Sequence, residues 1–417
     1  MTYTLRGETF FETSFQLMKQ EGGCRLDFVS RRVQTLPPYI FSQFQQRKKE
    51  LEAKGIDIID LGIGAPDLPT PKFIIDELKK EVENPENHRY SPYNGCIEFR
   101  EAVQHFYKKH YDVDLDPETE ILTLIGSKEG IANLISAVIN PGEKVLIPDP
   151  GYPVYRSAAH IAGGEVVSLP LDENDEYAPL FDRLTENDLE DAKLMFLNYP
   201  GNPTAATVEL DTFLKAISFA REKNLAVVHD AAYSLVTFDG YKAPSILQVP
   251  GAKDLAVEFG SLSKSFNMTG WRIGYVVGNK ELIRALSVVK SNTDTSQFLP
   301  IQKAAAKALF SDFSAVEDNN RVYKERLEAM LDALNTLGIE AKKPRGSFFI
   351  WAKVPKGLTS MEFVNKMLEE AGIIVTPGTA FGEAGEGYFR ISLSVETPRL
   401  QEAVNRMKQL HFEGAKE

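Results

Sequence analysis

The sequence is poor in the residues that define several common classes of protein. Its 417 residues include two cysteines, Cys24 and Cys96, and no C-x-x-C pair, so we expect neither a disulfide framework nor a zinc site. The six histidines show no metal-ligand spacing, and no metal site is predicted. A continuous apolar run of about 18 residues is also lacking, which argues against a membrane-spanning helix.

Positive charge is scarce as well. The formal net charge is −12 and the pI is about 5.2. No cluster of lysines and arginines is present, so the sequence indicates no nucleic-acid partner. The N-terminus lacks the continuous apolar segment of a signal peptide, and we therefore expect a cytoplasmic protein that does not bind membranes. An anionic substrate requires positive charge that is concentrated inside a site.

What the chain does contain is a regular alternation of helix-like and strand-like segments. Its length exceeds the size at which one hydrophobic core stops growing, which favours two domains. From residue 72 onward the alternation is typical of an α/β fold, in which a mostly parallel sheet is flanked by helices. The expected strands are Ile121–Ile125, Val145–Ile147, Glu165–Leu169, Leu194–Leu197, Leu225–Val228, Ala256–Phe259 and Ile273–Val277.

The pattern changes after about residue 298 to an α+β mixture. The expected elements are one long helical stretch over Ile301–Leu337, a strand over Phe348–Val354, a helix near Met361–Ala371, a strand over Tyr388–Leu393 and a helix from Thr397. The segment before Pro71 is too short to form a domain of its own. We therefore predict a large domain over residues 72–298, a small α+β domain built from residues 26–71 and 299–417, and an N-terminal arm over residues 1–25.

A lysine that follows an apolar run is the first candidate for chemistry. Lys264 comes shortly after the expected strand Ala256–Phe259. A lysine in this position can form an imine with an aldehyde cofactor. Ser261, Ser263 and Arg272 in the same segment offer hydroxyl donors and a bidentate cation, which suit a phosphate group. Taken alone, the segment is equally well explained as a polar loop with an exposed lysine.

An aspartate follows another expected strand, Leu225–Val228. The carboxylate of Asp230 can pair with the protonated nitrogen of a pyridine ring, and Tyr233 can form a hydrogen bond to the phenolic oxygen of that ring. The alternative for this motif alone is a helix-capping aspartate beside a packed tyrosine.

Two turn-like segments complete the candidate site. In N-Y-P-G-N-P-T, residues 198–204, Asn202 precedes a proline and is therefore biased away from helix, so we expect its amide to point inward. The segment G-S-K-E-G, residues 126–130, lies between a strand and a helix, where free backbone N–H groups bind anions. Each segment alone is also compatible with an ordinary turn.

Six motifs follow one another along the chain: G-S-K-E-G, D-P-G-Y-P, N-x-P-x-N-P-T, D-x-x-Y, S-x-S-K-x7-R and F-R-I-S. In this order they resemble the fold-type I, class I/II aminotransferases, which use pyridoxal 5′-phosphate (PLP), over roughly residues 35–412. Within that class the sequence is most similar to the LL-diaminopimelate aminotransferase-like group, which also includes alanine, glutamine and methionine-salvage transaminases. The resemblance implies a transaminase that moves an amino group from an L-amino acid to a 2-oxo acid by a ping-pong mechanism.

The resemblance also implies a role for each cofactor-binding residue. Lys264 forms the Schiff base and moves the proton, and Asp230 pairs with the pyridine nitrogen. The other implied contacts are Tyr152 on the face of the ring, Asn202 and Tyr233 at the phenolic oxygen, and Ser127, Lys128, Ser261, Ser263 and Arg272 around the phosphate.

Substrate contacts and a dimer are implied in the same way. Arg390, in F-R-I-S, clamps the substrate α-carboxylate, and Gly64 lies beside that carboxylate. Tyr90 reaches the phosphate in the neighbouring subunit, so we expect a homodimer. The chain departs from the family at Ala205, where glycine usually follows N-P-T, and this weakens the assignment to one subgroup.

The amino donor is left open by the sequence, with LL-diaminopimelate, alanine and glutamate among the candidates. The side-chain pocket is expected to draw on Tyr39, Tyr93 and residues 292–298, and the lack of arginine in that last segment argues against a strict aspartate enzyme. A PLP-dependent C–S lyase, or a lyase of the aminocyclopropane-carboxylate synthase type, can use the same residues. A PLP-binding regulator is disfavoured because a DNA-binding domain does not fit in the roughly 35 residues that precede the resemblance.

Overall fold

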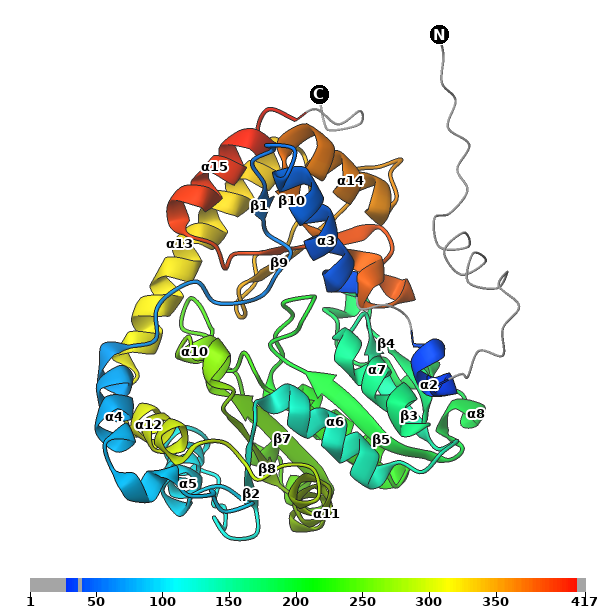
Figure 1. The fold of residues 1–417 in the computed structure, drawn as a ribbon. Coiled ribbons are helices and arrows are strands. Elements are labelled where there is room, and N and C mark those ends of the chain that lie inside the picture. Colours follow the sequence, from blue (N-terminus) through cyan, green and yellow to red (C-terminus); the bar gives the residue numbers. More distant parts are fainter. Residues whose placement is uncertain (1–27, 37–39, 411–417) are drawn as a thin grey trace. The chain divides into compact units, whose positions relative to one another are not determined.

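The computed structural model describes residues 28–36 and 40–410 of the chain. It has two units, of which the first ends at Leu36 and the second begins at Pro37. The described part of the first unit contains one short helix, α2 (Arg31–Gln34). The N-terminal arm predicted over residues 1–25 lies outside the described residues. All elements considered below belong to the second unit (Figure 1).

The second unit is built around a seven-stranded sheet with the order β2-β8-β7-β6-β5-β3-β4. Its strands are β2 (Ile121–Leu124), β3 (Lys144–Asp149), β4 (Glu165–Pro170), β5 (Ala192–Asn198), β6 (Ala226–Asp230), β7 (Ala256–Ser261) and β8 (Gly274–Gly278). Strands β4, β3, β5, β6 and β7 are mutually parallel, whereas β8 is antiparallel to both β7 and β2. The predicted α/β fold with a mostly parallel sheet is confirmed.

Helices cover both faces of this sheet (Figure 1). One apolar core lies against α4 (Lys72–Val82), α5 (Ile97–Tyr111), α9 (Leu210–Glu222) and α12 (Leu299–Leu309). The other lies against α6 (Ser127–Val138), α7 (Pro153–Ala162) and α11 (Lys280–Ser291). Successive residues of a strand point to opposite faces, so Leu197 and Val227 enter the first core while Phe196 and Val228 enter the second.

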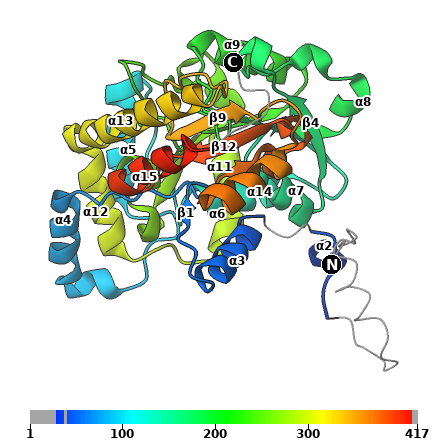
Figure 2. The same ribbon diagram turned by 90° about the horizontal axis from the view of Figure 1, so that it is seen from above.

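A third apolar core joins elements from the C-terminal part of the chain. These are α13 (Ser314–Thr336), β9 (Phe349–Lys353), α14 (Ser360–Ala371), β10 (Ile373–Ile374), β12 (Tyr388–Ser392) and α15 (Thr397–Met407), and Figure 2 shows this region from above. The short strand β11 (Thr376–Pro377) follows β10. β11, β12 and β9 form an antiparallel sheet. β1 (Ile59–Asp60), which follows α3 (Ile40–Glu52), pairs with β10, so a segment that precedes the large sheet in sequence joins the C-terminal elements. The domain boundaries at residues 72 and 298 stay a prediction.

The expectation of one uninterrupted helical stretch over Ile301–Leu337 is wrong. The structure has two helices there, α12 and α13, separated at residues 310–313. Phe313 adopts a left-handed conformation with a φ of 64°, and its ring packs 5.8 Å from that of Phe106. In the break, side-chain oxygens accept hydrogen bonds from backbone N–H groups. Ser311 Oγ accepts from Phe313 N, and Asp312 Oδ1 accepts from Ser314 N.

A buried ion pair fixes the loop that follows β1. Arg326 on α13 donates to Asp67 through both terminal nitrogens, at 2.7 and 2.8 Å, and Nη1 also donates to Leu393 O at 3.0 Å. The side chain of Arg326 is only 2% exposed. The loop that contains Gly64 is therefore held against the C-terminal elements.

We predict that Arg326→Met lowers the free energy of unfolding by about 3–5 kcal/mol, because it leaves Asp67 as an unpaired, largely buried carboxylate. Arg321→Met, on the exposed side of the same helix, is the matched control and is expected to change stability by no more than about 0.5 kcal/mol. Urea unfolding of both variants measures the difference. Equal losses in the two variants would contradict a stabilising role for the Asp67 pair.

Candidate active site

A cavity of about 280 Å³ lies at the carboxyl ends of β5 and β6. This is the edge at which ligands bind in open α/β sheets. The cavity is lined by nine of the residues singled out from the sequence: Gly64, Ser127, Lys128, Tyr152, Asn202, Asp230, Tyr233, Lys264 and Arg390. The fold thus brings together residues that the sequence places up to several hundred positions apart.

Lys264 lies on α10 (Leu262–Ser265), a short helix that directly follows β7. Ser261 caps this helix by accepting a hydrogen bond from Ser263 N at 3.2 Å. Lys264 Nζ donates to Gly64 O at 2.6 Å. Burial, together with the charges of Arg390 and Arg272, lowers the pKa of Lys264 to about 8. The amine is therefore much more readily deprotonated than that of an exposed lysine.

Asp230 is the last residue of β6 and is buried. Its Oδ2 accepts from Tyr155 Oη at 2.8 Å, and its Oδ1 accepts from Ala232 N at 3.3 Å. Burial raises the pKa of Asp230. A buried carboxylate of this kind is stabilised by a cation, and the protonated nitrogen of a pyridine ring meets that need.

The start of α6 forms the positively charged end of the cavity. Gly126, with a φ of 80°, precedes the helix, and a Cβ added there would lie 2.3 Å from Arg272 Nη2, so the guanidinium packs against this turn. Burial and the charge of Arg272 lower the pKa of Lys128. Two cations at the positive end of a helix dipole favour an anion, so these residues fit a phosphate group. Arg272 packs against this end, and neither Arg272 nor Ser261 nor Ser263 is among the residues that line the cavity.

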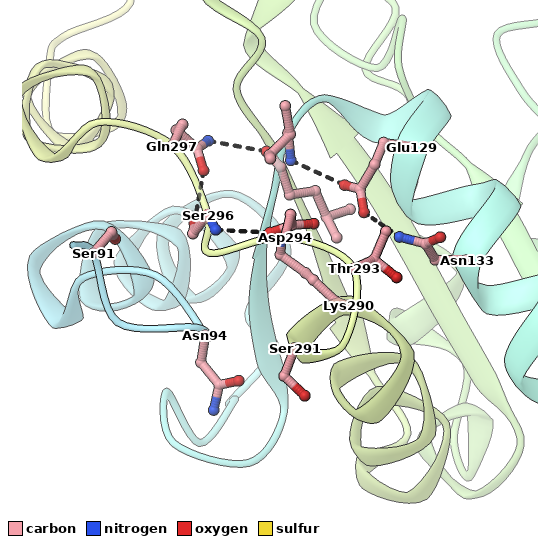
Figure 3. A network of polar contacts seen from close by, with 12 residues as sticks. Ser91, Asn94, Glu129, Asn133, Lys290, Ser291, Thr293, Asp294, Ser296 and Gln297 are labelled. Carbon is pink, nitrogen blue, oxygen red and sulfur yellow. Dashed lines mark hydrogen bonds and ion pairs between the residues drawn. The ribbon is translucent and has the colours of Figure 1, made fainter.

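A polar network lies behind the turn that precedes α6 (Figure 3). Glu129 Oε2 accepts from Ile125 N at 3.0 Å, and burial raises the pKa of this carboxyl group. Gln297 Nε2 donates to Leu124 O at 3.1 Å, and Asp294 accepts from Lys290 Nζ at 2.6 Å. The segment expected to form the side-chain pocket, residues 292–298, therefore supports this turn instead of lining the cavity.

Arg390 lies on β12, lines the cavity and is 2% exposed. Nη1 donates to Asn202 Oδ1 and Nη2 donates to Gly62 O, each at 2.6 Å. Its guanidinium lies 4.2 Å from the ring centre of Phe349. A Cβ added at Gly64 would lie 2.5 Å from Phe349 Cζ, so only glycine fits beside this ring. A buried, oriented guanidinium suits bidentate binding of a carboxylate.

Four positions that the sequence analysis singled out need separate comment. Tyr90 is 89% exposed and does not line the cavity of this chain, and neither does Tyr93. Tyr39 lies outside the described residues. Ala205 is buried and has a φ of 53°, so alanine adopts the left-handed conformation at the position where the resemblance leads one to expect glycine.

Two functional neighbours were missed from the sequence. Asn198 Nδ2 donates to Asp230 O and its Oδ1 accepts from Asn202 N, both at 2.7 Å. The sequence signal that could have identified Asn198 is a polar residue at the end of an apolar strand. Tyr155 lies three residues after Tyr152, a spacing that places two side chains on neighbouring parts of a helix surface. Ile63, Ala232 and Phe349 add apolar lining that carries no sequence signal.

Within residues 28–36 and 40–410, no helix is long and apolar enough to cross a membrane. The same residues contain no group of three or more histidine, cysteine, aspartate or glutamate side chains that could hold a metal ion.

Known proteins match the chain over most of its length. The family described as "Aminotransferase class I and II" matches residues 56–407. LL-diaminopimelate aminotransferase from Aquifex aeolicus is 51% identical over 381 residues, which are 91% of this chain and 98% of that protein. The enzyme of the same name from Moorella thermoacetica is 46% identical over the same shares. The solved structure of apo-BacF from Bacillus subtilis is 38% identical, covers 94% of this chain and 100% of its own, and has a TM-score of 0.90.

We predict that Lys264 reacts with a small aldehyde at a rate that rises with pH through about 8 and then levels off, because only the free amine reacts. An ordinary lysine continues to gain reactivity up to about pH 10.4. Imine formation in the apoprotein, trapped by reduction and quantified at Lys264 by peptide mass spectrometry, gives the profile, with the exposed Lys356 as internal control. Arg390→Gln removes a neighbouring positive charge and should move the midpoint to higher pH. A wild-type midpoint near 10 would show that the site does not activate this amine.

Proposed function

Because the chain belongs to the class I and II aminotransferase family, we propose that it transfers an amino group from LL-diaminopimelate to a 2-oxo acid. The chain is a PLP-dependent transaminase of fold type I, with an amino acid and a 2-oxo acid as substrates. The choice of donor is supported by relatives of that name, which are 46–51% identical and match over 98% of their own length. The geometry of the cavity supports the roles proposed for the residues that line it.

PLP, when bound, supplies an aldehyde for the amino group and a ring that accepts the electron pair of the Cα–H bond. We propose that Lys264 holds the cofactor covalently and moves the proton of the substrate Cα, since its pKa is lowered to about 8. Asp230 pairs with the protonated ring nitrogen and balances its charge. Lys128 and Arg272 bind the phosphate at the start of α6. Tyr152, Asn202 and Tyr233 orient the ring.

Arg390 is proposed to fix the substrate α-carboxylate and thereby the direction of the Cα–H bond. The guanidinium is already oriented by Asn202 and Gly62, so little ordering is left for the substrate to impose. The distal end of LL-diaminopimelate carries both a carboxylate and an ammonium group. A single arginine matches such an end poorly, and among the described residues that line the cavity Arg390 is the only arginine, which is consistent with this donor.

We also propose a homodimer in which Tyr90 reaches the cofactor phosphate of the partner, a cytoplasmic location, and a division into a large domain over residues 72–298 and a small domain from the two flanking segments. The strong exposure of Tyr90, at 89%, supports the first of these, because it leaves the side chain available to a second subunit. The pairing of β1 with β10 supports the last.

We predict that kcat/KM for LL-diaminopimelate, with 2-oxoglutarate as acceptor, exceeds that for alanine, glutamate and aspartate by at least about tenfold, because only the first carries both a carboxylate and an ammonium group at its distal end. Arg390→Gln should lower kcat/KM for every donor by about 30-fold or more, since it removes a buried charged contact, whereas the exposed Arg345→Gln should not. Steady-state assays of oxo-acid formation measure both effects. A preference for another donor would refute the substrate proposal, and ammonia release without an acceptor would favour the lyase.

We predict that Tyr90→Phe weakens retention of PLP about tenfold or more, because one hydrogen bond to a charged phosphate is lost. Tyr93→Phe, in the same loop, is the control. Cofactor loss on dialysis is followed by absorbance, and sedimentation gives the assembly. A monomer with full activity and normal cofactor retention would rule out the shared site.

A further inference from the structure

A buried polar cluster lies on the face of the sheet opposite to Asp230. His229 and Glu258 are partners in register on β6 and β7, and their side chains are 0% and 1% exposed. Leu197 and Val227, on the same face, belong to the apolar core beneath α5 and α9. Two ionisable side chains in such surroundings are tolerated only if their charges and hydrogen-bonding atoms are satisfied.

Four donors converge on the carboxylate of Glu258. Oε2 lies 2.8 Å from His229 Nδ1 and accepts from Ser245 Oγ at 3.0 Å and from Ile246 N at 2.9 Å, while Oε1 accepts from Tyr107 Oη at 2.6 Å. Burial and the charge of Glu258 raise the pKa of Tyr107, so this hydroxyl is a neutral donor. A protonated carboxyl oxygen accepts hydrogen bonds poorly, and this number of donors therefore favours the ionised carboxylate.

The imidazole of His229 faces an acceptor at each nitrogen. Nε2 lies 3.0 Å from Tyr199 O, and because a carbonyl oxygen only accepts, Nε2 carries a hydrogen. Nδ1 faces the ionised Oε2 of Glu258 and carries the second hydrogen. His229 is then an imidazolium ion, and the two side chains form an ion pair inside the sheet.

We propose that the His229–Glu258 ion pair is a positioning pair, which holds Tyr199 and with it the turn at residues 198–205 against the end of β6. Within this turn, Tyr199 directly follows Asn198, which donates to Asp230 O, and precedes Asn202 by three residues. Asn202 in turn accepts a hydrogen bond from Arg390. The pair thus supports both ends of the active site without touching the ligand, and this inference rests on the roles proposed above for Asp230 and Arg390.

The charge on His229 acts on the site as well. Burial raises the pKa of Asp230, and the positive charge of His229 is one of the influences that oppose this rise. Loss of the imidazolium should therefore disturb the ionisation of Asp230 beside the cofactor ring, in addition to loosening the turn.

The protonation state is tested by nitrogen NMR of the PLP-loaded protein with ¹⁵N-labelled histidine at pH 8, where a histidine with the ordinary pKa of about 6.5 is mostly neutral. We expect one imidazole with both nitrogens protonated, and we expect its signals to disappear in His229→Asn. A neutral imidazole at His229 would overturn the ion-pair assignment, and this result does not depend on the substrate.

The positioning role is tested with the double variant His229→Leu/Glu258→Gln, which leaves no unpaired buried charge and keeps an acceptor for Ser245 and Ile246. We expect KM for the amino donor to rise about five- to tenfold, the effect of one lost orienting hydrogen bond, and the pH dependence of the bound cofactor's absorbance to shift. Tyr107→Phe removes a donor to Glu258 but leaves the contact with Tyr199, so its KM should stay that of the wild type.

A double variant with wild-type KM and an unchanged absorbance profile would overturn the positioning role. A wild-type protein that fails to transaminate would instead overturn the proposed function. The NMR measurement would still show whether His229 and Glu258 form an ion pair.

Discussion

The side-chain amide of Asn198 is the contact on which the two ends of the active site depend. Its nitrogen donates to the backbone of Asp230, at the cofactor end, and its oxygen accepts from the backbone of Asn202. Asn202 in turn accepts from Arg390, at the substrate end. Because β5 and β6 are adjacent and parallel, with Asn198 opposite Asp230, a single amide at the strand end can serve both. Sheet register therefore helps to set the spacing between Asp230 and Arg390, the residues proposed to contact the cofactor ring and the substrate carboxylate.

Positive charge is concentrated in the cavity of an otherwise acidic chain. The chain as a whole is acidic, with a formal net charge of −12, yet the cavity contains Lys128, Lys264 and Arg390. Burial lowers the pKa of both lysines, and so does the charge of Arg272; the charge of Arg390 adds to the effect on Lys264. Positive charge that is costly without a ligand becomes favourable once a phosphate and a carboxylate bind. Asp230, with a raised pKa, has the complementary need for a cation.

Much of the fold and of the candidate site could be predicted from the sequence, because apolar runs and polar motifs at their ends are both local features of the chain. Apolar runs of strand length indicated the parallel sheet, and polar motifs at the strand ends indicated six of the residues that line the cavity. The family resemblance added Gly64, Tyr152 and Arg390. The break between α12 and α13 was missed because it depends on Phe313, whose ring packs against residues distant in sequence. Tyr155 and the His229–Glu258 pair were missed for the same reason, since a buried polar contact exists only once the strands are aligned.

The central claim is that Lys264 and its neighbours carry out amino-group transfer, and a single turnover tests it most directly. LL-diaminopimelate is added to the PLP-loaded protein without any 2-oxo acid, and the absorbance of the bound cofactor is followed together with the products. The account predicts loss of the visible absorbance and release of one oxo acid per site, with neither change in Lys264→Ala. An unchanged spectrum with every amino acid tried, or release of ammonia without an acceptor, would contradict it.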